Sequence, residues 1–129
     1  MSVAYVDTSC LVAVAFGEPR SDAVIRELEG CDEIVSSNLL DAELRSTLKR
    51  EEVEEGAEAL LQAITWVLPD RRLTPEIERA LGVRHLRGAD LWHLAAALYL
   101  AESPGDVTFL TLDQPQREVA AALGFQTPL

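Results

Sequence analysis

Four acidic residues stand where a charged side chain is costly to keep: Asp7, Glu43, Asp90 and Asp113. Asp7 and Asp113 each follow a short apolar run, and the other two lie within segments that have the pattern of packed helices. A carboxylate at a strand end or on the inner flank of a helix loses hydration unless a partner compensates its charge. One kind of partner could serve all four, because carboxylate oxygens suit the hard cations Mg²⁺ and Mn²⁺.

Carboxylates that hold divalent metal ions suit the hydrolysis of a phosphodiester bond. This reaction needs an in-line water and a stabilised leaving oxygen, and two metal ions roughly 4 Å apart can serve both. In parallel α/β sheets ligands bind beyond the carboxyl ends of the strands, where Asp7 and Asp113 are expected. We therefore predict a catalytic, metal-binding group of four acids.

Each of the three aspartates also has a simpler structural explanation. Asp7, Asp90 and Asp113 all stand at or near predicted helix starts, where an aspartate commonly caps the helix. Glu43 has no such role, although Arg50 on the same helix could pair with it. The two explanations are compatible, since a capping carboxylate at a strand end can also face a metal ion.

Two further polar residues lie near these acids in the sequence. His93 comes three residues after Asp90, and it could orient Asp90, contact a substrate or simply bond to a carboxylate. Thr111 alternates with Asp113 and could position a water molecule, or it could be an ordinary strand residue.

Several bases neighbour the acids and could contact RNA phosphates, although pairing with surface acids is the alternative. The candidates for such contacts are Arg45, Lys49 and Arg87.

The pattern of apolar residues predicts alternating strands and helices. We expect strands over 3–6, 33–36, 66–68 and 107–110, with an edge strand over 125–127. We expect helices over 8–16, 21–29, 38–50, 53–63, 75–82, 89–101 and 114–123. Such alternation is typical of an α/β fold around a mainly parallel sheet.

Length and charge narrow the range of functions. A chain of 129 residues is expected to form a single domain over 1–129. Its net charge of −11 argues against general binding to duplex DNA or to membranes, but it allows an RNA held through metal ions. With no signal peptide, no apolar run long enough to span a bilayer and two cysteines outside any motif, we expect a soluble cytoplasmic protein.

Four sequence segments, in order, resemble the PIN-domain ribonucleases, and specifically the VapC-type toxins of prokaryotic toxin–antitoxin pairs. They are YVDTS at 5–9, LDAEL at 40–44, GADLWHLAAA at 88–97 and LTLD at 110–113. The resemblance implies a PIN-like α/β/α sandwich and a Mg²⁺- or Mn²⁺-dependent endoribonuclease with Asp7, Glu43, Asp90 and Asp113 as its acidic site. It also implies a homodimer and a cognate antitoxin protein that blocks the site.

The chain departs from this family at one place. Some members carry a further acid shortly after the last aspartate, where this chain has Gln114, Gln116 and Arg117. This departure puts the occupancy of a second metal position in question.

Three other functions fit parts of the pattern. A catalytically inactive PIN-like domain could serve as a binding module. An aspartyl phosphatase could use Asp7 as its nucleophile, but position 9 is Ser where such sites usually carry a second Asp. A receiver-like module with Asp70 as phosphoacceptor would need a Lys after a late strand, and the one Lys is Lys49.

Overall fold

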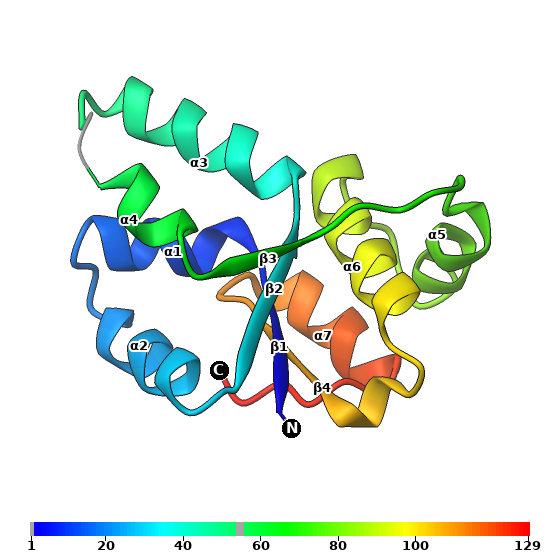
Figure 1. The fold of residues 1–129 in the computed structure, drawn as a ribbon. Helices are drawn as coiled ribbons and strands as arrows, with labels where there is room; N and C mark the ends of the chain where they lie inside the picture. The colour runs from blue at the N-terminus through cyan, green and yellow to red at the C-terminus, as the bar shows by residue number, and fades with distance from the viewer. Residues whose placement is uncertain (1, 54–55) are drawn as a thin grey trace.

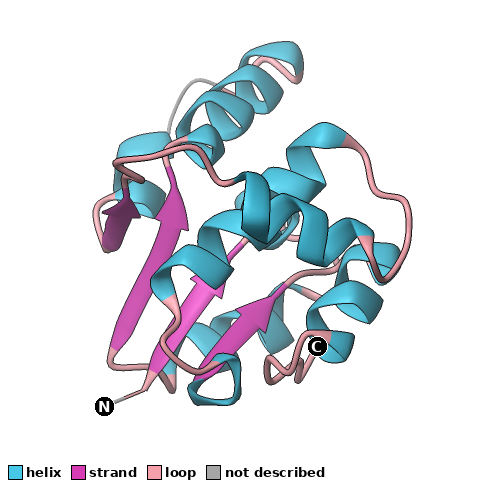
Figure 2. Ribbon diagram, turned by 90° about the vertical axis from the view of Figure 1, so that its right-hand side faces the viewer, coloured by secondary structure: helices cyan, strands magenta, loops and turns pink. Residues whose placement is uncertain are grey.

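A four-stranded parallel sheet forms the centre of the protein. The computed structural model describes residues 2–53 and 56–129. The strands are β1 (Val3–Val6), β2 (Glu33–Ser37), β3 (Ile64–Val67) and β4 (Val107–Leu110). They lie in the order β3-β2-β1-β4, and every neighbouring pair runs parallel (Figure 2). All four carboxyl ends therefore point to the same edge of the sheet, which confirms the predicted fold class.

Helices cover both faces of this sheet (Figure 1). One face carries α1 (Thr8–Ala15), α2 (Ser21–Glu29), α3 (Leu39–Arg50) and α4 (Ala57–Leu61), and the other carries α5 (Thr74–Leu81), α6 (Gly88–Leu100) and α7 (Gln114–Ala122). A short 3₁₀ turn, η1 (Pro104–Asp106), leads into β4. The result is an α/β/α sandwich.

The alternation of side chains along β1 divides the core into two apolar clusters. Ala4 and Val6 pack with α1–α4, whereas Tyr5 packs with α5–α7. The helices meet these clusters with apolar stripes. On α3 the stripe is Leu40, Leu44 and Leu48, all buried at intervals of four residues.

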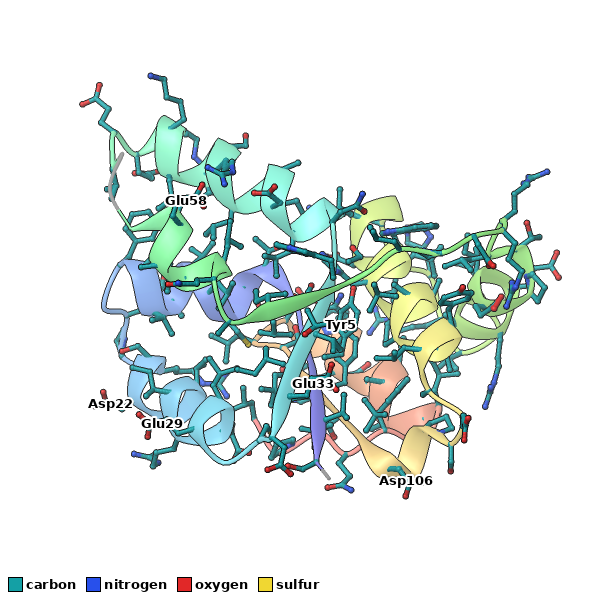
Figure 3. All side chains as sticks on the ribbon, viewed as in Figure 1. Tyr5, Asp22, Glu29, Glu33, Glu58 and Asp106 are labelled. Atoms are coloured by element: carbon teal, nitrogen blue, oxygen red, sulfur yellow. The ribbon has the colours of Figure 1, made fainter. Side chains whose placement is uncertain are left out.

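The acidic residues outside the four candidates lie mostly on the surface. Figure 3 shows Tyr5 in the interior, while the labelled acids Asp22, Glu29 and Asp106 lie on the outside of the fold, where their side chains are exposed. This arrangement accounts for much of the net charge without requiring a function for it.

Two predicted elements are wrong in their limits. The helix predicted over 53–63 is shorter, since α4 begins at Ala57 after Gly56, whose φ of 101° lies in the left-handed region that favours glycine. Residues 54 and 55 of that prediction lie outside the described residues. The strand predicted over 66–68 is Ile64–Val67, because Ile64 and Val67 are the buried positions and Leu68, next to Pro69, is 65% exposed.

The C-terminal edge strand is reduced to one bridge. Gln126 pairs with Thr108 in parallel, through a hydrogen bond of 2.8 Å from the Phe109 N–H to the Gln126 carbonyl. Among the described residues, no helix has the length and apolar character needed to cross a membrane.

The central packing of α6 leads to a prediction about stability. Leu94 is completely buried between the sheet and its neighbouring helices, while Leu100 on the same helix is 38% exposed. Leu94→Ala should lower the free energy of unfolding by about 2–5 kcal/mol, because it leaves a cavity in the core. Leu100→Ala should lower it by less than about 1 kcal/mol. Urea denaturation compares the two, and equal losses would contradict a central position for α6.

Candidate active site

Asp7 occupies the middle of the carboxyl edge of the sheet. It follows β1 directly, and its N–H donates to the carbonyl of Leu110 on β4 at 3.1 Å, so the strand pairing continues to the aspartate itself. The side chain is only 4% exposed. The sheet thus carries a carboxylate into the protein interior at the place where parallel sheets bind ligands.

Two hydroxyl groups lie within hydrogen-bond distance of the Asp7 carboxylate. Ser9 Oγ donates to Oδ1 at 2.6 Å, and Thr111 Oγ1 lies 3.1 Å from Oδ2. Burial raises the pKa of Asp7 from 3.8 to about 6, and the Ser9 hydrogen bond offsets only part of this effect. Asp7 is therefore a buried acid that forms no ion pair with a described Lys or Arg, and the nearby His93 offsets only part of the effect of burial on its pKa.

Glu43 lies on the inner flank of α3 and is held by two donors. Thr8 Oγ1 donates to Oε1 at 2.8 Å, and Nε2 of His93 lies 2.7 Å from the same oxygen. Partial burial works to raise the pKa of Glu43, but the hydrogen bonds from His93 and Thr8 outweigh it and the net shift is downward. Glu43 therefore stays ionised.

His93 is oriented by a buried tyrosine. The Ser37 N–H donates to Tyr5 Oη at 3.1 Å, and Tyr5 Oη lies 2.8 Å from His93 Nδ1. Burial raises the pKa of Tyr5 to about 12, so the hydroxyl keeps its proton and can donate it to Nδ1. With Nδ1 accepting from Tyr5, Nε2 carries the proton that faces the acceptor Glu43. His93 thus orients Glu43, whereas the sequence spacing had also allowed Asp90 as its partner.

Asp90 and Asp113 share a cavity of about 250 Å³ at the entrance to this edge of the sheet. Asp113 caps α7 by accepting the Gln116 N–H at 2.9 Å, as the simpler explanation predicted. Asp90 does not cap α6, because Arg87 occupies the N-cap position and Asp90 lies within the first helical turn. The Asp90 Oδ2 atom is 3.4 Å from Arg87 Nη2. Both carboxylates remain partly open to solvent.

The donors at this edge match a hard divalent cation in kind, because they are carboxylate oxygens and Asp7 forms no ion pair with a described Lys or Arg. The side chains do not form a closed coordination shell as they are placed. Within residues 2–53 and 56–129, no three acidic, histidine or cysteine side chains are grouped so that they could hold a metal ion. Metal binding would therefore need some of these side chains to change rotamer.

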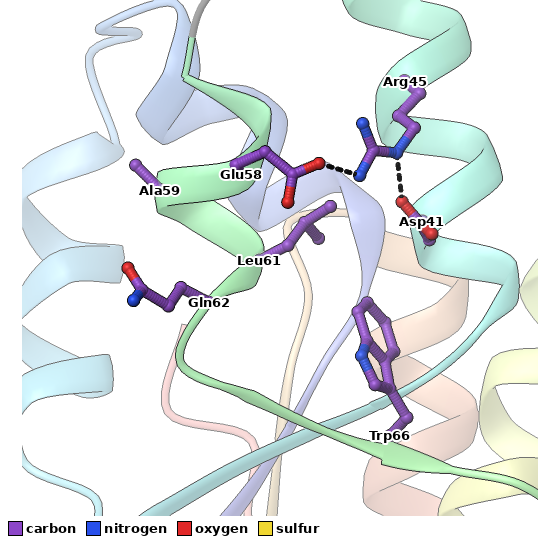
Figure 4. Close-up of a pocket in the computed structure, with 7 residues that line it drawn as sticks. All are labelled: Asp41, Arg45, Glu58, Ala59, Leu61, Gln62 and Trp66. Carbon is purple, nitrogen blue, oxygen red and sulfur yellow. Dashed lines mark hydrogen bonds and ion pairs between the residues drawn. The ribbon is translucent and has the colours of Figure 1, made fainter.

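The three bases proposed to contact phosphates lie in different places. Arg87 belongs to the Asp90–Asp113 cavity, and its positive charge contributes to the lowered pKa of Glu43. Arg45 pairs with Asp41 at 2.6 Å and with Glu58 across a cavity of about 630 Å³ between α3 and α4 (Figure 4). Lys49 lines a neighbouring groove with Arg45.

One alternative pairing from the sequence is not found among the described residues, and Asp70, considered above as a phosphoacceptor, is hydrogen-bonded to a tyrosine. Arg50 pairs with Glu51 at 3.1 Å and not with Glu43. Asp70 accepts a hydrogen bond from the Tyr99 hydroxyl at 2.9 Å, while Arg71 pairs with Glu76.

The sequence reasoning missed several polar residues of the site. Thr8 and Ser9 follow Asp7 directly, so their position was the available signal. Gln116 is completely buried, and it contacts both Thr111 and the Asp90 backbone. A polar residue in the first turn of a helix gives no sequence signal that it is buried.

Comparisons with known proteins agree with this geometry. The PIN domain family profile matches residues 4–122. The chain is 32% identical to Ribonuclease VapC46 of Mycobacterium tuberculosis (strain ATCC 25618 / H37Rv) over 126 residues, which cover 96% of this chain and 95% of that protein. No solved structure matches significantly.

The buried charge of Asp7 leads to a prediction about pH and stability. An acid whose pKa is raised on folding binds more protons in the folded state, so stability is lost as the pH rises from 3.8 to about 6. Above this range the ionised Asp7 costs about 3 kcal/mol. Asp7→Asn should therefore stabilise the protein at pH 7.5, and the gain should shrink towards pH 4.

Urea unfolding in EDTA at several pH values measures this difference without any metal. Asp22→Asn on the exposed surface of α2 is the matched control and should change little. An Asp7→Asn gain that does not depend on pH would mean that the carboxylate is not strained by burial.

Proposed function

The chain belongs to the PIN domain family, and from this premise we propose that it is a metal-dependent endoribonuclease acting as the toxin of a toxin–antitoxin pair. The observation that carries the proposal is the buried Asp7 carboxylate, which forms no ion pair with a described Lys or Arg and lies at the carboxyl edge of a parallel sheet. Asp90, Asp113 and the α3 residue Glu43 approach the same edge. The similarity to a protein named as a ribonuclease supports RNA as the substrate.

In this proposal Mg²⁺ or Mn²⁺ is held by Asp7, Glu43, Asp90 and Asp113. When bound, the metal ion would lower the pKa of a water molecule and stabilise charge on the phosphate oxygens. The protein's own groups orient the ligands. Ser9 donates to Asp7 with Thr111 Oγ1 3.1 Å from it, while Thr8 and His93 hold Glu43 in its ionised form. We assign to His93 and Thr111 the positioning of water or substrate. Any of the four carboxylates could orient the attacking water.

Substrate phosphates are proposed to meet Arg87 first. Its side chain is 84% exposed and lies at the rim of the cavity shared by Asp90 and Asp113. Arg45 is a weaker candidate because Asp41 and Glu58 already engage it, and Lys49 lies beside Arg45 and not in the Asp90–Asp113 cavity.

The remaining parts of the proposal follow the family resemblance. They are a single PIN-like domain over 1–129, a homodimer, a cytoplasmic location and a cognate antitoxin. The acidity of the site favours an antitoxin segment that is basic and places a cation among the carboxylates.

The alternative of a catalytically inactive binding module is favoured by one observation: the described acids are not grouped as a ready metal site. The phosphatase alternative is weakened, because Ser9 donates a hydrogen bond to Asp7 and the Asp7 side chain is almost inaccessible.

The proposal predicts RNA cleavage that needs both a metal ion and Asp7. Purified protein should cut cellular RNA into discrete fragments with Mg²⁺ or Mn²⁺ and not with EDTA. Asp7→Asn should reduce the rate by more than the roughly 10–100-fold typical for losing a residue that supports a metal ligand. Asp22→Asn, purified in parallel, should cut like the wild type. Metal binding without cleavage would favour the binding module, and equal cleavage by Asp7→Asn would reject the proposed site.

Arg87 gives a prediction about substrate binding. In the Asp7→Asn background, Arg87→Ala should weaken RNA binding similarly for all sequences and lower the salt dependence by about one phosphate contact. Fluorescence anisotropy at several salt concentrations measures both effects. Arg26→Ala is the control, since it removes the same charge from the exposed surface of α2. Equal losses in the two variants would mean that Arg87 acts only through net charge.

A further inference from the structure

Gln116 is the one described glutamine that is completely buried, with 0% of its surface exposed. It lies in the first turn of α7, close to three of the proposed ligands. Burying an amide is costly unless its donors and acceptors find partners. Gln116 satisfies them with groups that belong to the edge of the sheet where the site lies.

The partners of Gln116 come from separate parts of the chain. Its Nε2 donates to the Asp90 carbonyl at 3.0 Å, and its Oε1 lies 2.7 Å from Thr111 Oγ1. Its backbone N–H donates to Asp113 Oδ2 at 2.9 Å. One residue thus contacts the first turn of α6, the end of β4 and the cap of α7.

The chemistry of these partners fixes the orientation of the amide. A backbone carbonyl can only accept a hydrogen bond, so the NH₂ group must face Asp90. The amide oxygen then faces Thr111, whose hydroxyl donates to it and also accepts the Asp113 N–H at 3.1 Å. With its oxygen occupied by Thr111, Gln116 is a support for the ligands and not a ligand itself.

The bond to Asp90 joins groups that are distant in sequence. Asp90 and Gln116 are 26 residues apart, and among the described residues no other hydrogen bond ties Asp90 to the β4–α7 corner. The rest of α6 is held by its buried side chains and by His93, whereas this amide is the described hydrogen bond that ties its first turn, which carries Asp90, to the corner that carries Asp113.

We propose that Gln116 is a positioning residue that fixes the first turn of α6, which carries Asp90, against the β4–α7 corner, which carries Asp113, so that the two carboxylates can share a divalent cation. The inference rests on the proposed function. It explains why an amide stands here: glutamate could accept from Thr111 but, when ionised, could not donate to Asp90, and it would add a negative charge beside three others. An aliphatic side chain could do neither.

The test is Mn²⁺ affinity, measured by calorimetry on the purified protein, with RNA cleavage as a second readout. Gln116→Met keeps the length and removes both hydrogen bonds, and it should weaken Mn²⁺ binding roughly 10–100-fold. Gln116→Glu should also weaken it, because the donor to Asp90 is lost. Gln114→Leu, on the exposed side of the same turn, should bind Mn²⁺ like the wild type.

The outcomes separate this inference from the proposed function. A wild type that neither binds Mn²⁺ nor cleaves RNA would reject the function. A wild type that does both, with Gln116→Met unchanged, would reject the positioning role alone, and tighter Mn²⁺ binding by Gln116→Glu would show instead a ligand position. A purely structural role would lower stability in EDTA while leaving the Mn²⁺ affinity of the folded variant intact.

A measurement on the wild type covers the case in which the variants do not fold. The side-chain NH₂ protons of Gln116 should exchange with solvent much more slowly than those of the exposed Gln114 in an NMR experiment. Equal exchange rates for the two side chains would overturn the proposed positioning role of Gln116.

Discussion

The placement of one carboxylate in the interior, at Asp7, is the constraint on which the rest of the site depends. An all-parallel sheet brings every strand's carboxyl end to one edge, and the pairing of β1 with β4 extends to the Asp7 N–H. The charge is thereby held in a medium that raises its pKa, with hydroxyl groups as its partners. Hydroxyl groups orient a carboxylate but do not neutralise it, so the site retains a demand for positive charge.

The second acid, Glu43, is controlled in the opposite way. Its pKa is lowered, because a chain of hydrogen bonds from the Ser37 N–H through Tyr5 and His93 delivers a donor to it. Tyr5 and Asp7 stand two residues apart on one strand and its extension, but Tyr5 points into the α5–α7 cluster. The same strand therefore positions one acid directly and the other through the histidine of α6. Such paired environments, one raising and one lowering a pKa, are characteristic of functional sites.

The parts of the site that follow from local sequence were predictable, and the parts that depend on tertiary contacts were not. Apolar runs that end in Asp7 and Asp113 predict strand ends, because a charged side chain is costly to bury within a strand. The partner of His93 lies 50 residues away, and no local spacing could choose Glu43 over Asp90. In the sequence, Gln116 has the character of a solvent-facing residue. Its burial depends on the packing of α7 on α6, which no local pattern reveals. The limits of α4 depended on Gly56 adopting a positive φ, which the apolar pattern does not reveal.

The net charge of −11 constrains how such a protein can hold RNA. Around Asp7, Asp90 and Asp113 the local field repels phosphate, although Arg87 pairs with Asp90 at 3.4 Å. A divalent cation bound among these acids would reverse the local sign, so that RNA affinity would follow metal binding and not precede it. An acidic surface elsewhere then limits nonspecific nucleic-acid binding. Under the proposed function, the acidity of the protein would confine RNA binding to the metal-loaded edge of the sheet.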